Sequence, residues 1–387
     1  MRSTVIDVTR LVDRTLQGRL PTGVDRVGLA YVSHFRARAR ALVRFGGRWI
    51  ELGSGDSRRV FDSLLAPDVR SARALRWCVG RAYALRWQGG AERPLLINTG
   101  HSGLDDPDYG RRSARRGCKP LFFLHDLIPI THPEYCRAGE SERHRRRLAT
   151  MLSAGKGLVV NSQVTREALE SFAAQERLAT PPCAVVPLAP ASLPPASLAS
   201  PLGKPYFVIL GTIEPRKNHL LLLHLWRNLV QQFGTAAPRL LVIGQRGWEC
   251  ENVVDLLERC EPLRGFVSEH SCCSDAELAT YLRHARALLF PSFEEGYGMP
   301  LVEALAVGVP VLASTLPVFR EIADDIPEYI DPLDGNAWHR MILDYAAADS
   351  ALRNAQLRRM TGYRPPTWPD HFAKVEELIE RIDAAGS

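Results

Sequence analysis

Long apolar runs are missing from this chain of 387 residues. No stretch of about 18 apolar residues occurs, which is roughly the length that a helix needs to cross a bilayer. Charged residues also interrupt the first segment, MRSTVIDVTRLVDR, so it lacks the apolar core of a secretory signal peptide. We therefore expect the protein to be cytoplasmic.

Paired cysteines with metal-binding spacing are also absent. The chain has eight cysteines, but none forms a CxxC pair. The vicinal Cys272 and Cys273 have neither the spacing of a zinc site nor that of a usual disulfide. Reduced and mostly buried thiols fit this pattern and a reducing compartment.

The glycine fingerprint of dinucleotide-binding enzymes is the third absence. An NAD-dependent oxidoreductase should carry G-x-G-x-x-G directly after a first strand. The nearest strings begin at Gly211 and Gly244, and neither fits. The sequence therefore argues against that class of enzyme.

Positive charge is concentrated in one half of the chain, although the net charge is only +6. Residues 1–203 carry 31 Lys and Arg against 18 Asp and Glu, whereas residues 204–387 carry 18 against 25. The densest basic clusters lie at 111–116 and 143–147. Such a half can attract nucleic acid, anionic lipid or an anionic substrate, or it can be a solvated Arg-rich surface. No RNA-binding aromatic signature accompanies it, so we favour lipid or substrate phosphate over nucleic acid.

A proline-rich segment divides the chain. Residues 187–205 read PLAPASLPPASLASPLGKP, and prolines sustain neither a helix nor a central strand. We predict a first domain over 1–190, a linker over 191–205, a second domain over 206–365 and a final segment over 366–387.

Short apolar runs alternate with helical patterns on both sides of this linker. The expected strands are Thr4–Val8, Pro94–Asn98, Leu121–Leu124, Gly157–Val160, Tyr206–Leu210, Leu240–Ile243, Ala287–Phe290 and Val309–Ala313. Strands separated by helices predict a doubly wound parallel sheet in each half, an α/β fold. In such sheets ligands bind at the C-terminal ends of the strands, next to helix N-termini.

Two helix starts in the second half carry recognisable caps. Ser274 and Glu277 have the spacing of a capping box. Asn218 stands where it can cap a helix over His219–Phe233. The helix after Asn218 would then begin just after the expected strand Tyr206–Leu210 and its loop.

The segment PSFEEGYGMPLVEAL, residues 291–305, joins an expected strand to an expected helix. Gly296 and Gly298 let the backbone turn sharply and present N–H groups, which suit phosphate oxygens or sugar hydroxyls. Glu295 precedes the helix, and Glu303, expected in its first turn, could accept hydrogen bonds from a ribose diol. The alternative is a capped helix with a solvated acidic loop.

The segment LGTIEPRKNH, residues 210–219, places Arg216 and Lys217 before a helix N-terminus. The helix dipole disfavours cations there. The pair therefore suggests that an anionic ligand compensates the charge, since Arg and Lys both bind phosphate. A solvated basic turn is the alternative.

Polar residues also follow two strands of the first half. In LFFLHDLIPIT, His125 directly follows a buried strand, so we expect its side chain to face a cleft between the domains. Asp126 could bind an acceptor hydroxyl or merely start the loop. His101 could line an acceptor pocket, but both histidines have the alternative of a packed, hydrogen-bonded role. Asp106 and Asp108 form an Asp-x-Asp string among turn residues, and we predict no metal site there.

Taken in order, TGVDR, HDLIP, NSQVTREAL, GTIEPRKNH, SDAEL and PSFEEGYGMPLVEAL resemble the retaining glycosyltransferases of family 4, which have the GT-B fold. The resemblance covers nearly the whole chain. It is most specific in GTIEPRKN and in the Glu-x7-Glu string, and looser in the first half. It implies two Rossmann-like domains facing a cleft, with the final helix crossing back onto the first domain.

The resemblance also implies roles for individual residues. Arg216 and Lys217 would hold the donor diphosphate, Glu295 would contact the donor sugar, and His125 would touch the transferred sugar. The further donor-binding residues that it implies are Gly23, Gly211, Ser292, Gly296, Tyr297, Gly298 and Glu303, the last on ribose hydroxyls. Gly23 stands in Thr-Gly-Val rather than in the Gly-Gly pair of the family. Asp126 and His101 are the candidate acceptor residues.

We therefore expect a hexosyltransferase that moves a sugar, with mannose favoured, from a nucleotide sugar to a growing, lipid-linked oligosaccharide or polysaccharide. GDP-mannose is favoured over UDP-hexose as the donor. The resemblance implies retention, and two fixed cations with a helix N-terminus can stabilise the leaving diphosphate without metal or cofactor. A GT-B epimerase or phosphorylase, or a non-catalytic sugar-nucleotide-binding protein, remains the alternative. The basic half leads us to expect peripheral contact with the inner, anionic face of the plasma membrane.

Overall fold

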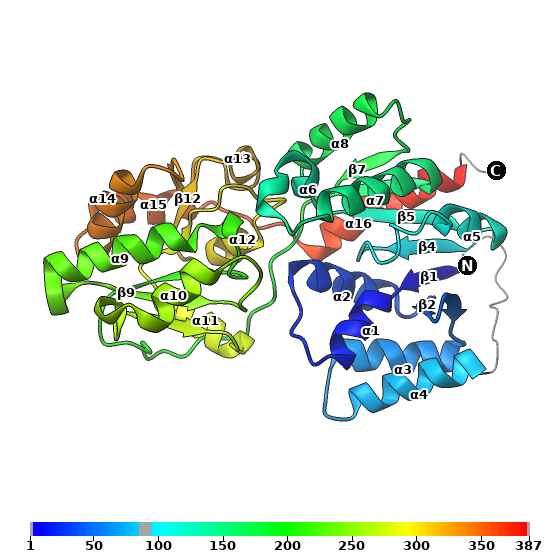
Figure 1. The fold of residues 1–387 in the computed structure, drawn as a ribbon, viewed down its shortest axis with the longest axis horizontal. Coiled ribbons are helices and arrows are strands. Elements are labelled where there is room, and N and C mark those ends of the chain that lie inside the picture. The colour runs from blue at the N-terminus through cyan, green and yellow to red at the C-terminus, as the bar shows by residue number, and fades with distance from the viewer. Residues whose placement is uncertain (1–2, 85–93, 385–387) are drawn as a thin grey trace. The chain divides into compact units, whose positions relative to one another are not determined.

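A computed structural model describes residues 3–84 and 94–384 of the chain, which fold into two compact units (Figure 1). The first unit takes its residues from Met1–Ile130, Gly139–Leu188 and Trp368–Ser387. The second takes them from Thr131–Ala138 and Ala189–Thr367. Residues 186–205, which include the proline-rich segment, contain no helix or strand.

The first unit is built on a seven-stranded sheet of order β3-β2-β1-β4-β5-β6-β7. Its strands are β1 (Thr4–Asp7), β2 (Ala39–Phe45), β3 (Arg48–Glu51), β4 (Leu95–Asn98), β5 (Lys119–Leu124), β6 (Gly157–Val160) and β7 (Cys183–Val185). All neighbours pair in parallel except β2 and β3. Every residue of β1, β4 and β6 is buried, as expected of strands covered on both faces.

Helices cover this sheet, and the last of them comes from the end of the chain. The helices are α1 (Thr9–Leu16), α2 (Gly23–Phe35), α3 (Ser54–Leu65), α4 (Ser71–Ala84), α5 (Tyr109–Arg115), α6 (Ile128–Thr131), α7 (Glu140–Ala154), α8 (Gln163–Gln175) and α16 (Trp368–Ala384). Helix α16 packs on β6 and β7. A Cβ atom at Gly157 would lie 2.4 Å from Ile382 Cδ1, so the side chain of Ile382 on α16 packs directly against this strand. This packing confirms that the final helix crosses back onto the first domain.

The second unit is built on a six-stranded sheet of order β10-β9-β8-β11-β12-β13 in which all neighbours are parallel. Its strands are β8 (Tyr206–Leu210), β9 (Arg239–Ile243), β10 (Val267–His270), β11 (Leu288–Phe290), β12 (Val311–Ser314) and β13 (Glu328–Ile330). Its helices are α9 (His219–Phe233), α10 (Glu251–Arg259), α11 (Asp275–His284), α12 (Met299–Ala306), α13 (Pro317–Ala323), α14 (Gly335–Ala346) and α15 (Ala351–Met360). The two sheets confirm the predicted doubly wound α/β class.

The two predicted helix caps have different outcomes. The capping box is confirmed: the Ser274 N–H donates to Glu277 Oε2 at 2.9 Å, and the Glu277 N–H donates to Ser274 Oγ at 3.2 Å. The prediction that the Asn218 side chain caps α9 is wrong, although α9 begins at His219 as predicted. Asn218 takes a left-handed backbone with φ of 57°, and its side-chain amide donates to the Pro332 carbonyl at 3.0 Å. The amide therefore ties two loops together instead of capping α9.

No helix in the parts of the chain that the structure describes is long and apolar enough to span a bilayer.

Candidate donor-binding site

Two loops at neighbouring strand ends of the second unit carry most of the candidate site. Strand β8 pairs with β11, and parallel neighbours end at the same edge of a sheet. The loop after β8 contains the short 3₁₀-helix η2 (Pro215–Lys217), and the loop after β11 runs from 291 to the start of α12. The Phe293 N–H donates to the Arg216 carbonyl at 2.9 Å, which joins the two loops through their backbones.

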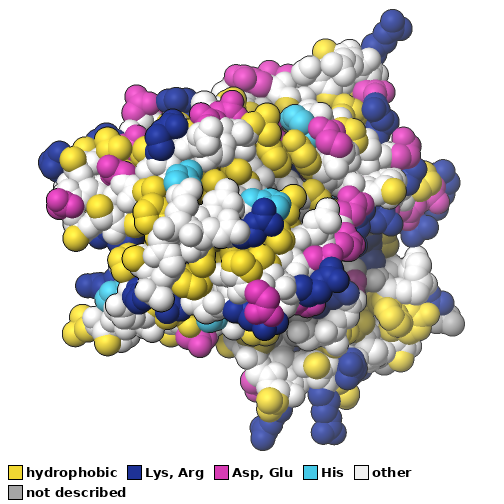
Figure 2. Space-filling view, turned by 60° about the vertical axis from the view of Figure 1, so that its left-hand side comes forward, with side chains coloured by type: hydrophobic (Ala, Val, Ile, Leu, Met, Phe, Trp, Pro, Cys, Tyr) yellow, Lys and Arg dark blue, Asp and Glu magenta, His cyan; other side chains and the backbone are white. Residues whose placement is uncertain are grey.

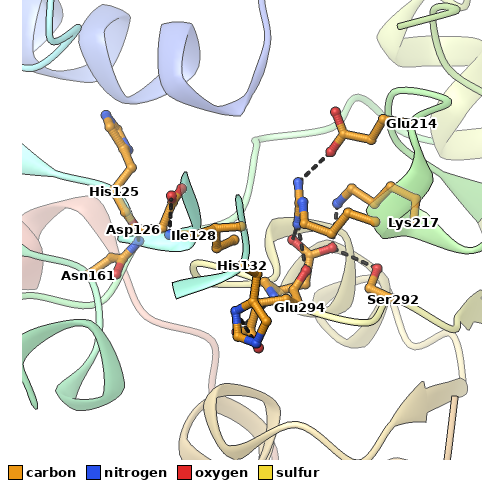
Figure 3. Close-up of polar contacts among 11 residues, drawn as sticks. His125, Asp126, Ile128, His132, Asn161, Glu214, Lys217, Ser292 and Glu294 are labelled. Carbon is orange, nitrogen blue, oxygen red and sulfur yellow. Dashed lines mark hydrogen bonds and ion pairs between the residues drawn. The ribbon is translucent and has the colours of Figure 1, made fainter. Parts of the chain in front are cut away.

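The carboxylate of Glu295 lies at the centre of this junction. Lys217 Nζ donates to Glu295 Oε1 at 2.5 Å, and Arg216 Nη1 lies 2.8 Å from Glu295 Oε2. The Ser292 hydroxyl also donates to Oε1, at 2.7 Å (Figure 3). Glu295 is 7% exposed and Lys217 is 9% exposed. The structure therefore brings four of the predicted site residues together in one buried ionic cluster.

The guanidinium of Arg216 has two further partners in the same loops. It donates to Glu214 Oε1 at 2.6 Å and to the Glu294 carbonyl at 2.7 Å. The sequence predicts that an external anion compensates the positive charge of Arg216 and Lys217. The structure corrects it, because Glu295 and Glu214 compensate both cations within the chain. The two cations alone are therefore no evidence for a ligand.

The charges in the cluster decide the ionisation of Glu295. Burial acts to raise the pKa of Glu295, but the charges of Arg216 and Lys217 and the hydrogen bonds from Lys217 and Ser292 outweigh it and lower that pKa to about 2. Burial lowers the pKa of Lys217, and the charge of Glu295 opposes this shift. Glu295 is therefore a carboxylate at neutral pH, available as a hydrogen-bond acceptor.

The glycine-rich turn after Glu295 leads into α12. Gly298 has φ of 109°, and a Cβ atom there would lie 2.7 Å from the Phe319 ring, so only glycine fits. Tyr297 is buried and Gly296 is half-buried. Glu303 is the fifth residue of α12 and is buried. It therefore lies beyond the first helical turn, and the prediction that it lies within that turn is wrong.

Gly211, the last predicted donor-site residue of the second unit, follows β8 with φ of 144°. A Cβ atom at this position would lie 3.5 Å from Lys217 Cε, so Gly211 lies directly beside the lysine stem.

Two acidic residues of the second unit belong to the junction but were not singled out from the sequence. Glu214 lies inside the string GTIEPRKN, two positions before its partner Arg216. Glu294 is adjacent to Glu295. Both residues lie in the two strand-end motifs, and a carboxylate within a buried loop of this kind needs a cation nearby. Their position in these motifs was therefore the signal that could have identified them from the sequence.

In the first unit, His125 lies directly after β5 and is buried. Its Nε2–H donates to the Thr99 carbonyl at 2.7 Å, while Asn161 donates to the His125 carbonyl at 2.8 Å (Figure 3). Burial lowers the pKa of His125 to about 4, so the ring is neutral at pH 7. Because Nε2 carries the proton, Nδ1 is the hydrogen-bond acceptor of the neutral ring.

The candidate acceptor residues lie near His125. The ring centroids of His101 and His125 are 5.2 Å apart, and His101 Nε2–H donates to the Phe123 carbonyl at 2.8 Å. Asp126 Oδ1 accepts the Ile128 N–H at 3.1 Å and so starts the loop into α6. Both residues have the structural partners that the alternative interpretation expected, and their acceptor roles stay predictions.

Gly23 is the first residue of α2 and is exposed. The turn before it is held by Asp25, whose Oδ2 accepts the Thr22 N–H at 2.8 Å and whose Oδ1 accepts from Arg10 Nε at 2.7 Å. The charge of Arg10 acts to lower the pKa of His125, and the charge of Asp25 acts to raise it.

The Asp-x-Asp string is engaged with arginines. Arg111 Nη2 lies 2.9 Å from Asp108 Oδ1, and Arg112 Nη1 lies 3.6 Å from Asp106 Oδ2. Within residues 3–84 and 94–384, no three His, Cys, Asp or Glu side chains form a group that could hold a metal ion.

The basic cluster at 143–147 is also largely ion-paired. Arg147 lies 2.6 Å from Glu140 and Arg146 lies 3.3 Å from Glu142, while Arg145 pairs with Glu176. Figure 2 shows the same mixing on the face that it draws, where basic and acidic side chains lie next to one another. The positive charge counted from the sequence is therefore partly neutralised where it is densest.

Comparison with known proteins identifies one domain of the chain. Residues 194–329 match the family described as glycosyl transferases group 1. These residues form a group 1 glycosyl transferase domain. Both strand-end loops of the ionic cluster lie inside it.

Two curated relatives of this chain are named as mannosyltransferases. The O-antigen chain mannosyltransferase B of Escherichia coli is 30% identical over 252 residues, which cover 63% of this chain and 66% of the relative. The O-antigen chain mannosyltransferase RfbU of Salmonella typhimurium is 30% identical over 181 residues, which cover 46% of this chain and 43% of the relative. The chain thus spans less than two thirds of the length of either relative.

Solved structures extend the likeness to the whole chain. HepE of Anabaena, crystallised with UDP and glucose, has a TM-score of 0.64 at 14% identity and covers 99% of this chain and 100% of its own. Sucrose-phosphate synthase of Thermosynechococcus elongatus has a TM-score of 0.62 at 16% identity, with both chains fully covered. These likenesses confirm the GT-B fold of the chain.

Proposed function

We propose that this protein is a mannosyltransferase that uses a nucleotide-sugar donor, GDP-mannose by preference over UDP-hexose, and extends a lipid-linked oligosaccharide or polysaccharide. The observation that carries the proposal is the buried cluster of Arg216, Lys217, Ser292 and Glu295 inside the group 1 domain. The names of the curated relatives support mannose as the transferred sugar.

The cluster has the charges that a nucleoside diphosphate leaving group needs. In the proposed mechanism, Arg216 and Lys217 bind the donor diphosphate while they keep their contacts with Glu295. The planar guanidinium can hold two phosphate oxygens at once, and the lysine adds a point charge. As the bond from the sugar to the phosphate breaks, both cations stabilise the growing negative charge. The ionised Glu295 accepts hydrogen bonds from hydroxyls of the sugar.

The remaining step follows from retention, which we propose on the resemblance to family 4. The acceptor hydroxyl attacks the anomeric carbon from the face of the leaving group, and its proton passes to the leaving phosphate oxygen. The new C–O bond thus replaces the broken one without a metal ion. A neutral His125 suits this chemistry, because a protonated ring would repel the positive charge that develops at the anomeric carbon.

Hydrolysis of a panel of nucleotide sugars in the absence of acceptor tests this proposal. A transferase should release the nucleoside diphosphate slowly from one preferred donor. An epimerase would isomerise the sugar, a phosphorylase would need inorganic phosphate, and a non-catalytic binding protein would do none of these. Thermal shifts with GDP-, UDP- and ADP-sugars identify the base, because a ligand that binds only the folded state raises the melting temperature.

We expect activity to survive EDTA. Arg216 and Lys217 supply the charge that a metal ion supplies in other transferases, while Asp106 and Asp108 are paired with arginines. Transfer rates measured before and after dialysis against chelator should agree. Loss of activity in EDTA that Mg²⁺ or Mn²⁺ restores would show that the metal-free mechanism is wrong.

We also propose reversible contact of the first unit with an anionic membrane. Each basic group near such a surface contributes about 1 kcal/mol within roughly a Debye length, and ion pairing of Arg145–Arg147 reduces this contribution. Co-sedimentation with vesicles should rise with the anionic lipid fraction, fall with salt and weaken when Arg145–Arg147 become Gln. The matched change Arg246→Gln in the second unit should leave co-sedimentation with the vesicles unaltered. Equal binding to neutral and anionic vesicles would contradict the proposal.

A further inference from the structure

A short segment of the first half of the sequence belongs to the second unit. Residues Thr131–Ala138, here called the strap, include the 3₁₀-helix η1 (Pro133–Tyr135). The chain on either side of the strap belongs to the first unit. Within the second unit the strap contacts residues that lie far away in sequence.

Aromatic and cationic side chains anchor the strap. The ring of Tyr135 stacks on Phe293 with centroids 5.5 Å apart and an interplanar angle of 6°. On its own segment, Tyr135 also stacks with His132, at 5.9 Å. The guanidinium of Arg137 lies 5.1 Å from the ring centroid of Trp248. The strap is therefore attached at two points, one of which is the loop of the ionic cluster.

The attachment point Phe293 lies between Ser292 and Glu295. The Arg216 carbonyl accepts the Phe293 N–H, and the Arg216 guanidinium donates to the Glu294 carbonyl. Arg216 thus fixes the backbone of this segment. The strap engages its side chains, since Tyr135 covers the Phe293 ring and His132 Nδ1 lies 4.0 Å from Glu294 Oε2.

We propose that Tyr135 and His132 are positioning residues that hold the Phe293–Glu294 segment and thereby set the place of Glu295 against the donor sugar. This inference rests on the proposed function and names the part of the donor that depends on the strap. Arg216 is also held by Glu214, which lies outside the segment that the strap contacts, so the diphosphate site keeps a support of its own. The strap should therefore affect recognition of the sugar and hardly affect recognition of the nucleoside diphosphate.

The test is a comparison of two dissociation constants in the Tyr135→Ala variant of the full chain. An aromatic pair contributes about 0.5–1.5 kcal/mol, which corresponds to a change of about 2- to 10-fold in binding. We expect GDP-mannose, or whichever donor the panel identifies, to bind more weakly by this factor in calorimetry. The corresponding nucleoside diphosphate should change by less than about twofold. Tyr135→Phe keeps the stacked ring and should restore the wild-type constants.

Matched variants keep the result interpretable. Tyr281 packs its ring against His270 at 5.0 Å in the same unit, and Tyr281→Ala should alter neither constant. His132→Gln should reproduce the effect of Tyr135→Ala in weaker form. Tyr135→Ala combined with Phe293→Ala should weaken sugar-nucleotide binding no more than either change alone.

The possible outcomes separate the two proposals. Unchanged sugar-nucleotide binding in Tyr135→Ala, or equal weakening of both ligands, would overturn the positioning role while the proposed function stands. A wild-type protein that binds no sugar nucleotide would overturn the proposed function and the role of the strap together.

Discussion

Turnover should fall by about 10²-fold or more in Lys217→Ala, because this variant removes one of the two cations that we propose stabilise the leaving diphosphate. The shape-matched Lys217→Met should behave alike, since it keeps the stem beside Gly211 and removes only the charge. The protein should stay folded, because Glu295 keeps Arg216 and Ser292 as partners. Initial rates at saturating donor, with circular dichroism of both variants, give the measurement.

Lys204→Ala is the matched control for this prediction. Lys204 is an exposed lysine of the same unit, and its ammonium donates to the Thr235 carbonyl. Its removal should leave turnover unchanged. Near wild-type turnover in Lys217→Ala would show that the lysine supports the loop and takes no part in transfer.

Glu295→Gln should lower turnover by about 10²–10³-fold, since a neutral amide replaces the carboxylate that we propose accepts hydrogen bonds from the sugar. Unlike the lysine variants, it should also destabilise the protein. It leaves the buried Lys217 and the half-buried Arg216 short of a partner, and breaking a buried ion pair costs about 3–5 kcal/mol. Rates should therefore be measured well below the melting temperature of the variant. The exposed Glu261, which pairs with Arg264, provides the control Glu261→Gln.

The destabilisation should depend on pH in a defined direction. The pKa of Glu295 is lowered to about 2 in the folded protein, so its ionised form stabilises the fold above its usual pKa. That stabilisation disappears as the pH falls from about 4.5 towards 2. The difference in unfolding free energy between wild type and Glu295→Gln should shrink over the same range. A difference that is constant from pH 7 to pH 3 would mean that Glu295 is not held as a carboxylate.

Continuous apolar runs were the most reliable guide to the fold. GLVV and YFVIL became β6 and β8 with both ends as predicted, because buried parallel strands are apolar at every position. Strand β10, VSEH, was missed because it is only partly buried and has no such run. The antiparallel hairpin of β2 and β3 was missed as well, although Gly46 and Gly47 mark its turn with φ of 55° and 71°.

The positions of the site residues at strand ends were predictable from the sequence, but the contacts between them were not. Because Arg216, Lys217 and Glu295 follow predicted parallel strands, the sequence was enough to place all three at one edge of a sheet. That Glu295 neutralises both cations depends on a contact across 78 positions, which no local pattern reveals. The stacking of Tyr135 on Phe293 spans an even longer interval of sequence. Asn218 shows the converse, because a residue suited to capping found a better partner at the Pro332 carbonyl.

The return of α16 to the first unit has a consequence for any attempt to produce that unit alone. A gene cut after residue 367 would remove the helix that packs on β6 and β7, so the damage would fall on the first unit. The chain leaves this unit for the second time after Leu188 and returns at Trp368, and these two points lie close together, since His371 Nδ1 bonds the Pro187 carbonyl at 2.9 Å. A short glycine linker from residue 188 to residue 368 should therefore allow the first unit to be expressed without residues 189–367.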